Sequence, residues 1–302
     1  MVYWRSVLFV FLGACSYGML STFVKLAYKA GFSPGEVSGS QMFLAMVCMW
    51  GVALLFSRQR IGTKQCIALM GVGVASGLTG ILYYQSLQYV PASIAIVLLF
   101  QFTWIGVIIA AIMERKKPGI EKIVALVLLM VGTLLSGNVF TGEFGQFNLI
   151  GIVFGLLSAI TYALFVIFSG RAASGELSPY TRAAVTLTGA MLVTFIIYPP
   201  SFLINGALMS DLLLYALPLA LFGGIIPVLF FTLGVSHIGG GLATILSAAE
   251  LPTAVLLSRI VLHENVTMLQ WLGVLIILGG IAFPEFVRKR RANRMQTDII
   301  SM

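Results

Sequence analysis

Ten long apolar segments, separated by short polar ones, follow one another along the whole chain. Each is close to the roughly 20 residues that a helix needs to cross a bilayer. The pattern therefore predicts an all-α integral membrane protein with ten transmembrane helices, at 6–25, 36–56, 66–88, 91–113, 121–138, 148–169, 179–198, 212–235, 240–262 and 267–287.

Composition agrees with a membrane protein, because 59% of the residues are hydrophobic and 9% are charged, whereas soluble domains carry about 25% charged residues. No stretch outside the apolar segments is long enough to bury a core of its own. The chain is thus expected to fold as one membrane domain, with the lipid bilayer as its surroundings.

The two halves of the chain resemble each other. Residues 13–18 (GACSYG) align with 158–163 (SAITYA), and the same shift places 32–34 (FSP) on 177–179 (LSP) without a gap. Because five crossings return the chain to the opposite side, the second copy is expected to be inverted, the plan of many secondary transporters. The alternative is chance similarity between apolar segments. The predicted units are a first repeat at 1–145, an inverted second repeat at 146–287 and a basic cytoplasmic tail at 288–302.

The basic residues predict the orientation of the spans. With a cytoplasmic N-terminus, three basic residues fall outside, namely Lys25, Lys29 and Arg259. Fifteen fall inside: Arg5, Arg58, Arg60, Lys64, Arg115, Lys116, Lys117, Lys122, Arg171, Arg182, Arg288, Lys289, Arg290, Arg291 and Arg294. Cytoplasmic loops are the ones enriched in Lys and Arg, so both termini are expected in the cytoplasm. The net charge of +8 then needs no nucleic-acid partner.

Glycine and proline mark two kinds of position within the spans. Glycines four apart, at 73 and 77 and again at 151 and 155, are typical of close helix packing. Gly223, Gly224, Pro227 and Pro252 interrupt the eighth and ninth spans. Because interrupted helices often line a substrate path, these four are candidates for helix breaks and gating. The alternative is a kink that serves packing alone.

Glu250 lies about 10 residues, or roughly 15 Å of helix, from either end of the ninth span. A charged group at that depth costs about 2.5 to 3.5 kcal/mol on insertion scales. Three interpretations stay open: a proton-coupling site, an anchor for a substrate amine, or a residue that only fixes the helix. Lys25, by contrast, is close enough to a span end to extend its ammonium group to the interface.

Aromatic and polar side chains that suit a partly apolar, partly polar ligand recur in both halves. Interfacial anchoring or local helix bonds are the alternative for each. The candidates for a substrate cavity, with Glu250, are Tyr17, Tyr83, Tyr84, Gln101, Trp104 and Tyr162.

Other function classes find little support. The two histidines are far apart, the three cysteines lack metal-ligand spacing, and no Gly-Lys-Ser or Gly-Lys-Thr phosphate loop occurs. We therefore expect no catalytic site, no metal, no cofactor and no direct use of ATP. An enzyme embedded in the membrane and a channel remain distant alternatives.

The chain resembles the EamA-type branch of the drug/metabolite transporter superfamily along nearly its whole length. The residues that carry the resemblance are Tyr84, the segment 87–93 (LQYVPAS), Glu114, the segment 250–253 (ELPT), His263-Glu264, Gly273 and Gly279-Gly280. One departure is Trp104, which occupies the first-half counterpart of Pro252 where such proteins often have proline. It argues against a flexible fourth helix.

The resemblance implies a bacterial cytoplasmic-membrane carrier for amino acids or related metabolites, with a cavity between the halves. We accordingly expect a secondary transporter that exports small organic solutes, aromatic or other apolar amino acids among them, by alternating access and with proton coupling as one option. A facilitator or an uptake permease for amino acids, nucleosides or other metabolites is the alternative. The expected oligomeric state is a monomer or a weak dimer.

Overall fold

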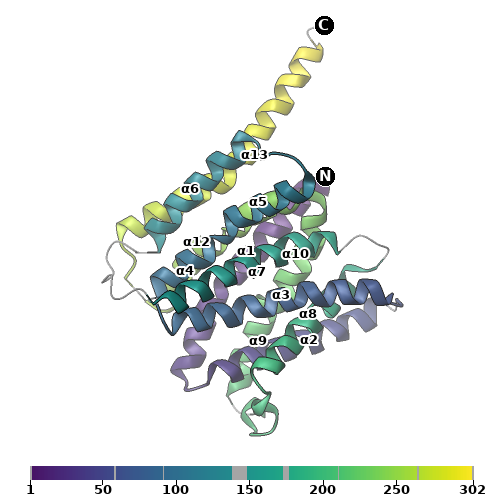
Figure 1. Ribbon diagram of the computed structural model, residues 1–302, viewed down its shortest axis with the longest axis vertical. Helices are drawn as coiled ribbons and strands as arrows, with labels where there is room; N and C mark the ends of the chain where they lie inside the picture. Colours follow the sequence, from purple (N-terminus) through teal and green to yellow (C-terminus); the bar gives the residue numbers. More distant parts are fainter. Residues whose placement is uncertain are drawn as a thin grey trace.

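The computed structural model describes residues 2–57, 59–90, 92–137, 148–172, 177–209, 211–263 and 265–300, and these parts are helical without a strand. Figure 1 shows the helices as one bundle. They are α1 (Val2–Lys29), α2 (Pro34–Phe56), α3 (Thr63–Leu87), α4 (Ala92–Phe100), α5 (Phe102–Glu114), α6 (Ile120–Ser136), α7 (Leu149–Arg171), α8 (Pro179–Ile197), α9 (Leu212–Ala220), the π-helix η4 (Leu221–Ile225), α10 (Ile226–Ile238), α11 (Gly240–Ser247), α12 (Glu250–Val261) and α13 (Met268–Ile300). Two short 3-10 turns, η2 (Ser201–Leu203) and η3 (Ala207–Met209), precede α9.

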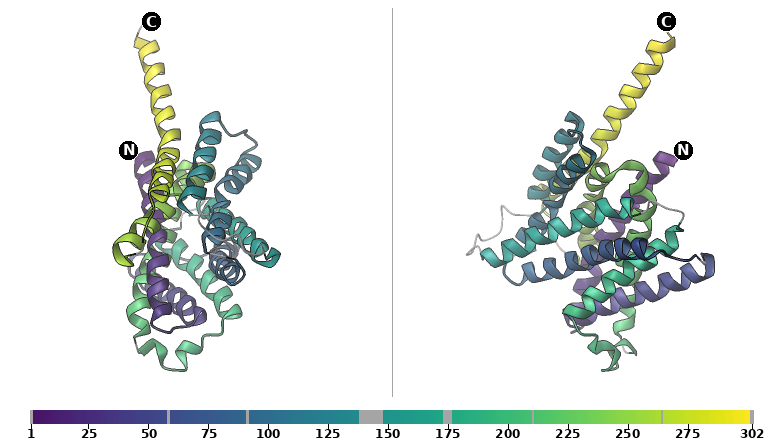
Figure 2. Two further views of the ribbon diagram at one scale, coloured as in Figure 1. Left: turned by 90° about the vertical axis from the view of Figure 1, so that its left-hand side faces the viewer. Right: turned by 45° about the vertical axis from the view of Figure 1, so that its right-hand side comes forward.

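The described helices confirm the predicted class of fold. Among the described residues, nine segments are long and apolar enough to cross a membrane, and the remaining predicted span, the fifth, corresponds to α6 with 17 residues. The largest difference in boundaries is at the C-terminus, where α13 continues to Ile300 instead of ending near 287. Figure 2 shows this extension projecting beyond the bundle, on the same side as the N-terminus. The predicted span ends at 91 and 138, and the repeat boundary near 145, fall outside the described residues.

The matched Ser-Pro pairs of the two halves each begin a helix. Ser33 caps α2 and Ser178 caps α8 through side-chain bonds to backbone N–H groups, and each is followed by a proline in the first helical turn. Proline is well suited to that turn because its missing N–H would have no helical partner there. In α2 the cap is completed by Glu36, whose carboxylate accepts from the backbone of Ser33.

Equivalent helices of the two halves also pack against equivalent partners in the other half. α1 packs on α10 as α3 packs on α7, while α5 meets α11 and α6 meets α13. In Figure 1, α6 and α13 lie side by side along one flank of the bundle. This is the contact pattern of two equivalent five-span repeats packed face to face.

Close helix crossings lie where the spaced glycines predict them. A Cβ at Gly73 of α3 would stand within contact distance of the backbone oxygen of Thr186 in α8, and one at Gly155 of α7 would lie 2.7 Å from Leu98. The absence of a side chain therefore lets the backbones of α3 and α8 touch at Gly73, and at Gly155 it leaves room for the side chain of Leu98.

Candidate functional site

A cavity of about 480 Å³ lies between the two repeats, with walls from α1, α2, α3, α4, α7 and α12. Its lining comes from the halves of these helices that are remote from the N-terminus of α1. On α1 it extends from Tyr17 to Tyr28, and on α3 from Ser76 to Tyr84. It also reaches Ser136 at the end of α6 and Gln270 near the start of α13. The cavity thus extends from the middle of the bundle toward one membrane face.

Two polar stripes form much of this wall. On α1, Tyr17, Ser21, Lys25 and Tyr28 line the cavity, and their spacing of three or four residues places them on one helix face. On α3, Ser76, Thr79 and Tyr83 repeat the arrangement. The predicted cavity residues Tyr17, Tyr83, Tyr84, Tyr162 and Glu250 all belong to this lining.

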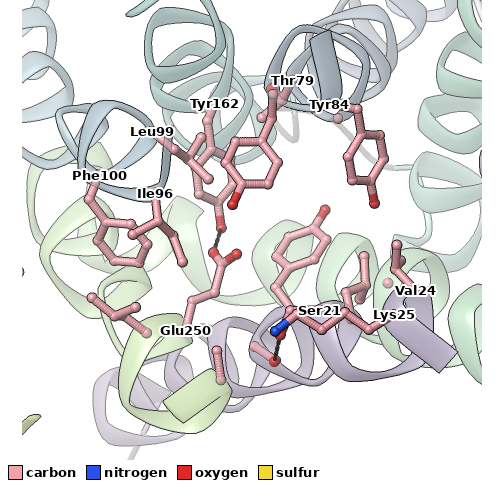
Figure 3. Close-up of a pocket in the computed structure, with 18 of the residues that line it drawn as sticks. Ser21, Val24, Lys25, Thr79, Tyr84, Ile96, Leu99, Phe100, Tyr162 and Glu250 are labelled. Carbon is pink, nitrogen blue, oxygen red and sulfur yellow. Dashed lines mark hydrogen bonds between the residues drawn. The ribbon is translucent and has the colours of Figure 1, made fainter. Parts of the chain in front are cut away.

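Glu250 lies at the deep end of the cavity. It is the first residue of α12, so it stands at a break in the ninth span and not inside a continuous helix. The hydroxyl of Tyr162 donates a hydrogen bond of 2.9 Å to its carboxylate, as Figure 3 shows. A tyrosine of the second repeat therefore positions the only acidic side chain among the described lining residues.

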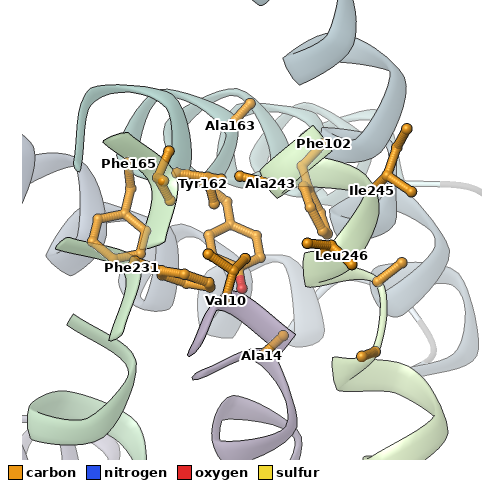
Figure 4. Packing of buried hydrophobic residues seen from close by; sticks show 14 of the residues in the cluster. Val10, Ala14, Phe102, Tyr162, Ala163, Phe165, Phe231, Ala243, Ile245 and Leu246 are labelled. Carbon is orange, nitrogen blue, oxygen red and sulfur yellow. The ribbon is translucent and has the colours of Figure 1, made fainter. Parts of the chain in front are cut away.

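Buried aromatic rings close the bundle beyond Glu250. The aromatic plug comprises Phe102, Tyr162, Phe165 and Phe231, each at most 4% exposed. The rings of Phe102 and Tyr162 have centroids 4.5 Å apart, and those of Phe165 and Phe231 are 5.6 Å apart. Figure 4 shows the plug packed with small and branched side chains of α1, α7 and α11. It blocks the path from the cavity toward the face that carries the chain termini.

The fourth span is interrupted at Gln101, between α4 and α5, although no proline lies near that position. The backbone N–H of Gln101 donates to the carbonyl of Leu98 at 3.2 Å. Its side-chain amide donates to the carbonyl of Val97 at 2.8 Å, in place of the backbone N–H that would do so in a regular helix. The indole N–H of Trp104 donates to Gln101 Oε1 at 2.7 Å and holds the amide in place. Side-chain hydrogen bonds thus do what a proline does in other helices.

The matching break in the ninth span has a different cause. Pro252 has no N–H for the carbonyl of Ala248, which instead accepts from Leu251 at 3.3 Å. Ala249 donates to Leu246 at 3.1 Å, as Gln101 does to Leu98. Under the offset that aligns Trp104 with Pro252, Gln101 aligns with Ala249, so the two repeats are interrupted at equivalent positions.

Pro227 follows the π-helix η4 and has no N–H to donate to the carbonyl of Gly223, four residues earlier. Gln41 of α2 donates to that oxygen at 3.3 Å, and Ser16 of α1 donates to the carbonyl of Phe222 at 2.7 Å. The interruption at Gly223 and Gly224 is consequently bound to the first repeat. Gly223 lines the cavity, whereas Gly224 is buried against Ala45.

Not every candidate residue reaches the cavity. Gln101 and Trp104 are absent from the described lining and belong to the break between α4 and α5, so substrate contact by them stays a prediction. Pro227 and Pro252 are buried in packing beside the cavity. Glu264 lies outside the described residues, and Glu114 ends α5 on the side of the chain termini.

Sequence reasoning assigned Lys25 to the interface and did not name Tyr28 or Thr79, and the structure places all three in the cavity lining. The signal that could have found them is the polar stripe on α1 and on α3, because apolar spans rarely repeat polar residues along one face without a reason. Lys25 and Glu250 are the only charged residues of the described lining. Among the described residues, no cluster of His, Cys, Asp or Glu could hold a metal ion.

Known proteins resemble the chain over almost its full length. The sequence profile of the EamA-like transporter family matches residues 4–138 and 149–284. The uncharacterized transporter YcbK of Bacillus subtilis (strain 168) is 25% identical over 293 residues, covering 91% of this chain and 90% of that protein. The uncharacterized inner membrane transporter YicL of Salmonella typhimurium is 27% identical over 232 residues, which is 76% of each chain.

A solved structure, described only as the crystal structure of a protein, has the same fold. It superposes with a TM-score of 0.74 at 15% sequence identity and covers 93% of this chain and 98% of its own.

Proposed function

From the premise that the chain belongs to the EamA-like transporter family, we propose that it is a secondary carrier that exports small organic metabolites, amino acids above all. The placement of Glu250 carries this proposal. A carboxylate at the deep end of a cavity, bonded to Tyr162 and bordering the aromatic plug, can bind the amine of a solute at the point where the path is closed. An amino acid brings such an amine.

The same carboxylate supplies a means of coupling. A carboxyl group that holds a proton cannot also pair with an ammonium ion, so proton and amine compete for Glu250. A carrier that moves only when one of them is bound exchanges solute for protons across the membrane. Protons entering the cell would then drive the solute out.

Alternating access would use the two repeats, which we propose are inverted relative to each other in a bacterial cytoplasmic membrane with both termini inside. In that orientation the cavity faces outward and the plug is the closed inner gate. The breaks at Gln101 and Ala249 lie at the height of the plug and allow the half-helices α5 and α11 to move. Moving them apart would open the inner side.

Counterflow in proteoliposomes tests the proposal. Vesicles are loaded with a mixed pool of unlabelled amino acids, and uptake of labelled leucine or phenylalanine is followed with and without a gradient of one pH unit. Such a gradient is worth about 1.4 kcal/mol, so exchange by the unaltered protein should be saturable and should change several-fold. Glu250→Gln should show no response to the gradient, because an amide neither binds a proton nor pairs with an amine.

Glu114→Gln is the matched control, since Glu114 is an exposed acid at the end of α5, away from the cavity. It should keep the gradient response. Saturable exchange that ignores the gradient in every variant would instead favour a facilitator. Exchange of no amino acid at all would contradict the proposed substrate and direct the search to nucleosides, sugars and drugs.

A further inference from the structure

The cavity holds one charge of each sign, and the two come from different repeats. Lys25 is an exposed residue of α1, and Glu250 begins α12. Figure 3 shows both side chains projecting into the same space, with Tyr162 and Tyr84 reaching toward them from the opposite wall. The remaining described lining residues are uncharged. A solute that matches this lining has one positive and one negative group and no net charge.

The packing of α1 on α12 fixes the relative height of the two charges. A Cβ at Gly18 would stand against the backbone oxygen of Glu250 and 2.7 Å from Thr253, so the first turn of α12 is level with Gly18. Lys25 follows two turns later, about 10 Å along α1. Helical side chains lean toward the N-terminus of their helix, so the side chain of Lys25 leans toward the level of Ser21. Along the helix axis, the two charged residues are thus about one to two turns, roughly 5 to 10 Å, apart.

An α-amino acid head group suits that separation. A charge-assisted contact takes about 2.8 Å at each end, and the amine and carboxylate of the solute lie two bonds apart, so a zwitterion bridges protein charges roughly 8 Å from each other. Its side chain would then face the apolar and aromatic part of the lining formed by Tyr83, Tyr84, Leu99 and Phe100.

We propose that Lys25 binds the carboxylate of the transported solute while Glu250 binds its amine, so that the cavity selects α-amino acids over amines of the same shape. This inference rests on the proposed function. It assigns Lys25 a role in specificity, in place of anchoring at the membrane interface.

The test compares two solutes that differ by one carboxylate. Labelled phenylalanine and its decarboxylated counterpart, phenethylamine, are measured in counterflow with the unaltered protein, with Lys25→Gln, and with Lys29→Gln as the control. Lys29 is also exposed and ends the same helix, but it is not part of the cavity lining. Loss of a charged hydrogen bond predicts a rise of about 10- to 100-fold in the half-saturation concentration of phenylalanine. For phenethylamine, Lys25→Gln should change the half-saturation concentration less than about 2-fold.

Lys25→Arg should retain most of the phenylalanine affinity, because guanidinium also pairs with carboxylates. A measurement on the unaltered protein guards against misfolded variants: phenylalanine amide, which lacks the negative charge, should compete with labelled phenylalanine at least 10-fold more weakly than phenylalanine does.

Equal effects of Lys25→Gln on the two solutes, an unchanged half-saturation for phenylalanine, or equal competition by the amide would overturn the inference and leave the proposed function intact. If the unaltered protein exchanges no amino acid, the proposed function itself fails. The two failures are therefore distinguishable.

Discussion

Tyr162 is the residue that joins the cavity to its closure. Its hydroxyl donates to Glu250, and its ring packs against Phe102 and Phe165 in the aromatic plug. A change in what Glu250 binds therefore alters the hydrogen bond of a side chain that belongs to the plug. In the proposed mechanism, this contact links solute binding to opening of the inner gate.

Tyr162→Phe should separate these two roles. It keeps the ring but removes the donor, and a hydrogen bond to a charged group is worth about 1.5 to 3 kcal/mol. We expect a slowdown of about 10-fold or more in counterflow with near-normal protein yield. Tyr89→Phe, at an exposed tyrosine outside the cavity lining, is the control. Unchanged exchange in Tyr162→Phe would show that the hydroxyl is dispensable.

At the residue scale, the sequence pointed to Glu250 and the tyrosines as candidates because an acid in mid-span and repeated aromatic residues stand out against an apolar background, and the structure places them in the lining of one cavity. It could not place Lys25, since a lysine near a span end reaches the interface as readily as a cavity. The distinction depends on which helix face turns inward. In the sequence, the only sign of the inward face of α1 is the spacing of Tyr17, Ser21 and Tyr28.

Among the elements, the broken spans α4–α5 and α11–α12 stand out. Both interruptions lie at equivalent positions of the repeats, yet one depends on Pro252 and the other on the side chain of Gln101. Because the two breaks are held by different interactions, we expect the half-helices α5 and α11 to differ in the free energy needed to move them.

Gln101→Leu should straighten the fourth span. Without the side-chain amide, the carbonyl of Val97 regains a partner only if the backbone N–H of residue 101 bonds to it as in a regular helix. We expect a lower maximal exchange rate with an unchanged half-saturation concentration, since the change affects movement and not solute contact. Gln88→Leu, at an exposed position after α3, serves as control. A raised half-saturation concentration alone would contradict a hinge role.

The break at Gln101 also marks where sequence reasoning fails at this scale. Proline is a known signal of an interrupted helix, and the structure has interruptions beside Pro252 and Pro227. A glutamine that bonds its own helix backbone leaves no such mark, because glutamine is otherwise a good helix former. The presence of Trp104 three residues later becomes informative only when its indole is seen to hold the amide.

For the whole molecule, the crossing of α3 and α8 is one of the closest contacts between the repeats. At Gly73 an added Cβ would also lie 2.9 Å from the backbone nitrogen of Ala190, whereas a Cβ at Gly71, half a turn away, meets nothing within 4 Å. Gly73→Ala should destabilise the protein by about 1 to 3 kcal/mol because the helices must separate.

Gly71→Ala is the control and should be neutral or slightly stabilising, since alanine favours a helix over glycine by roughly 0.5 to 1 kcal/mol. Thermal unfolding of the purified protein in detergent measures both. Equal stability of the two variants would show that the crossing relaxes without cost.

The architecture as a whole was largely predictable. Span number follows from hydropathy, because in lipid only helices and closed barrels satisfy the backbone. The partner of each helix did not follow, since contacts between helices in lipid are set largely by where small residues lie. The pairing of α6 with α13 through Gly132 and Gly273 emerged only from the structure.

The single carboxyl group of the described cavity lining sets a thermodynamic ceiling for the proposed antiport. One such group carries at most one proton per cycle, so each neutral zwitterion that leaves is matched by one positive charge that enters. Moving that charge through 100 mV is worth about 2.3 kcal/mol, and about 1.4 kcal/mol corresponds to a factor of ten. Each 100 mV of membrane potential can therefore sustain a solute ratio of no more than about 50-fold.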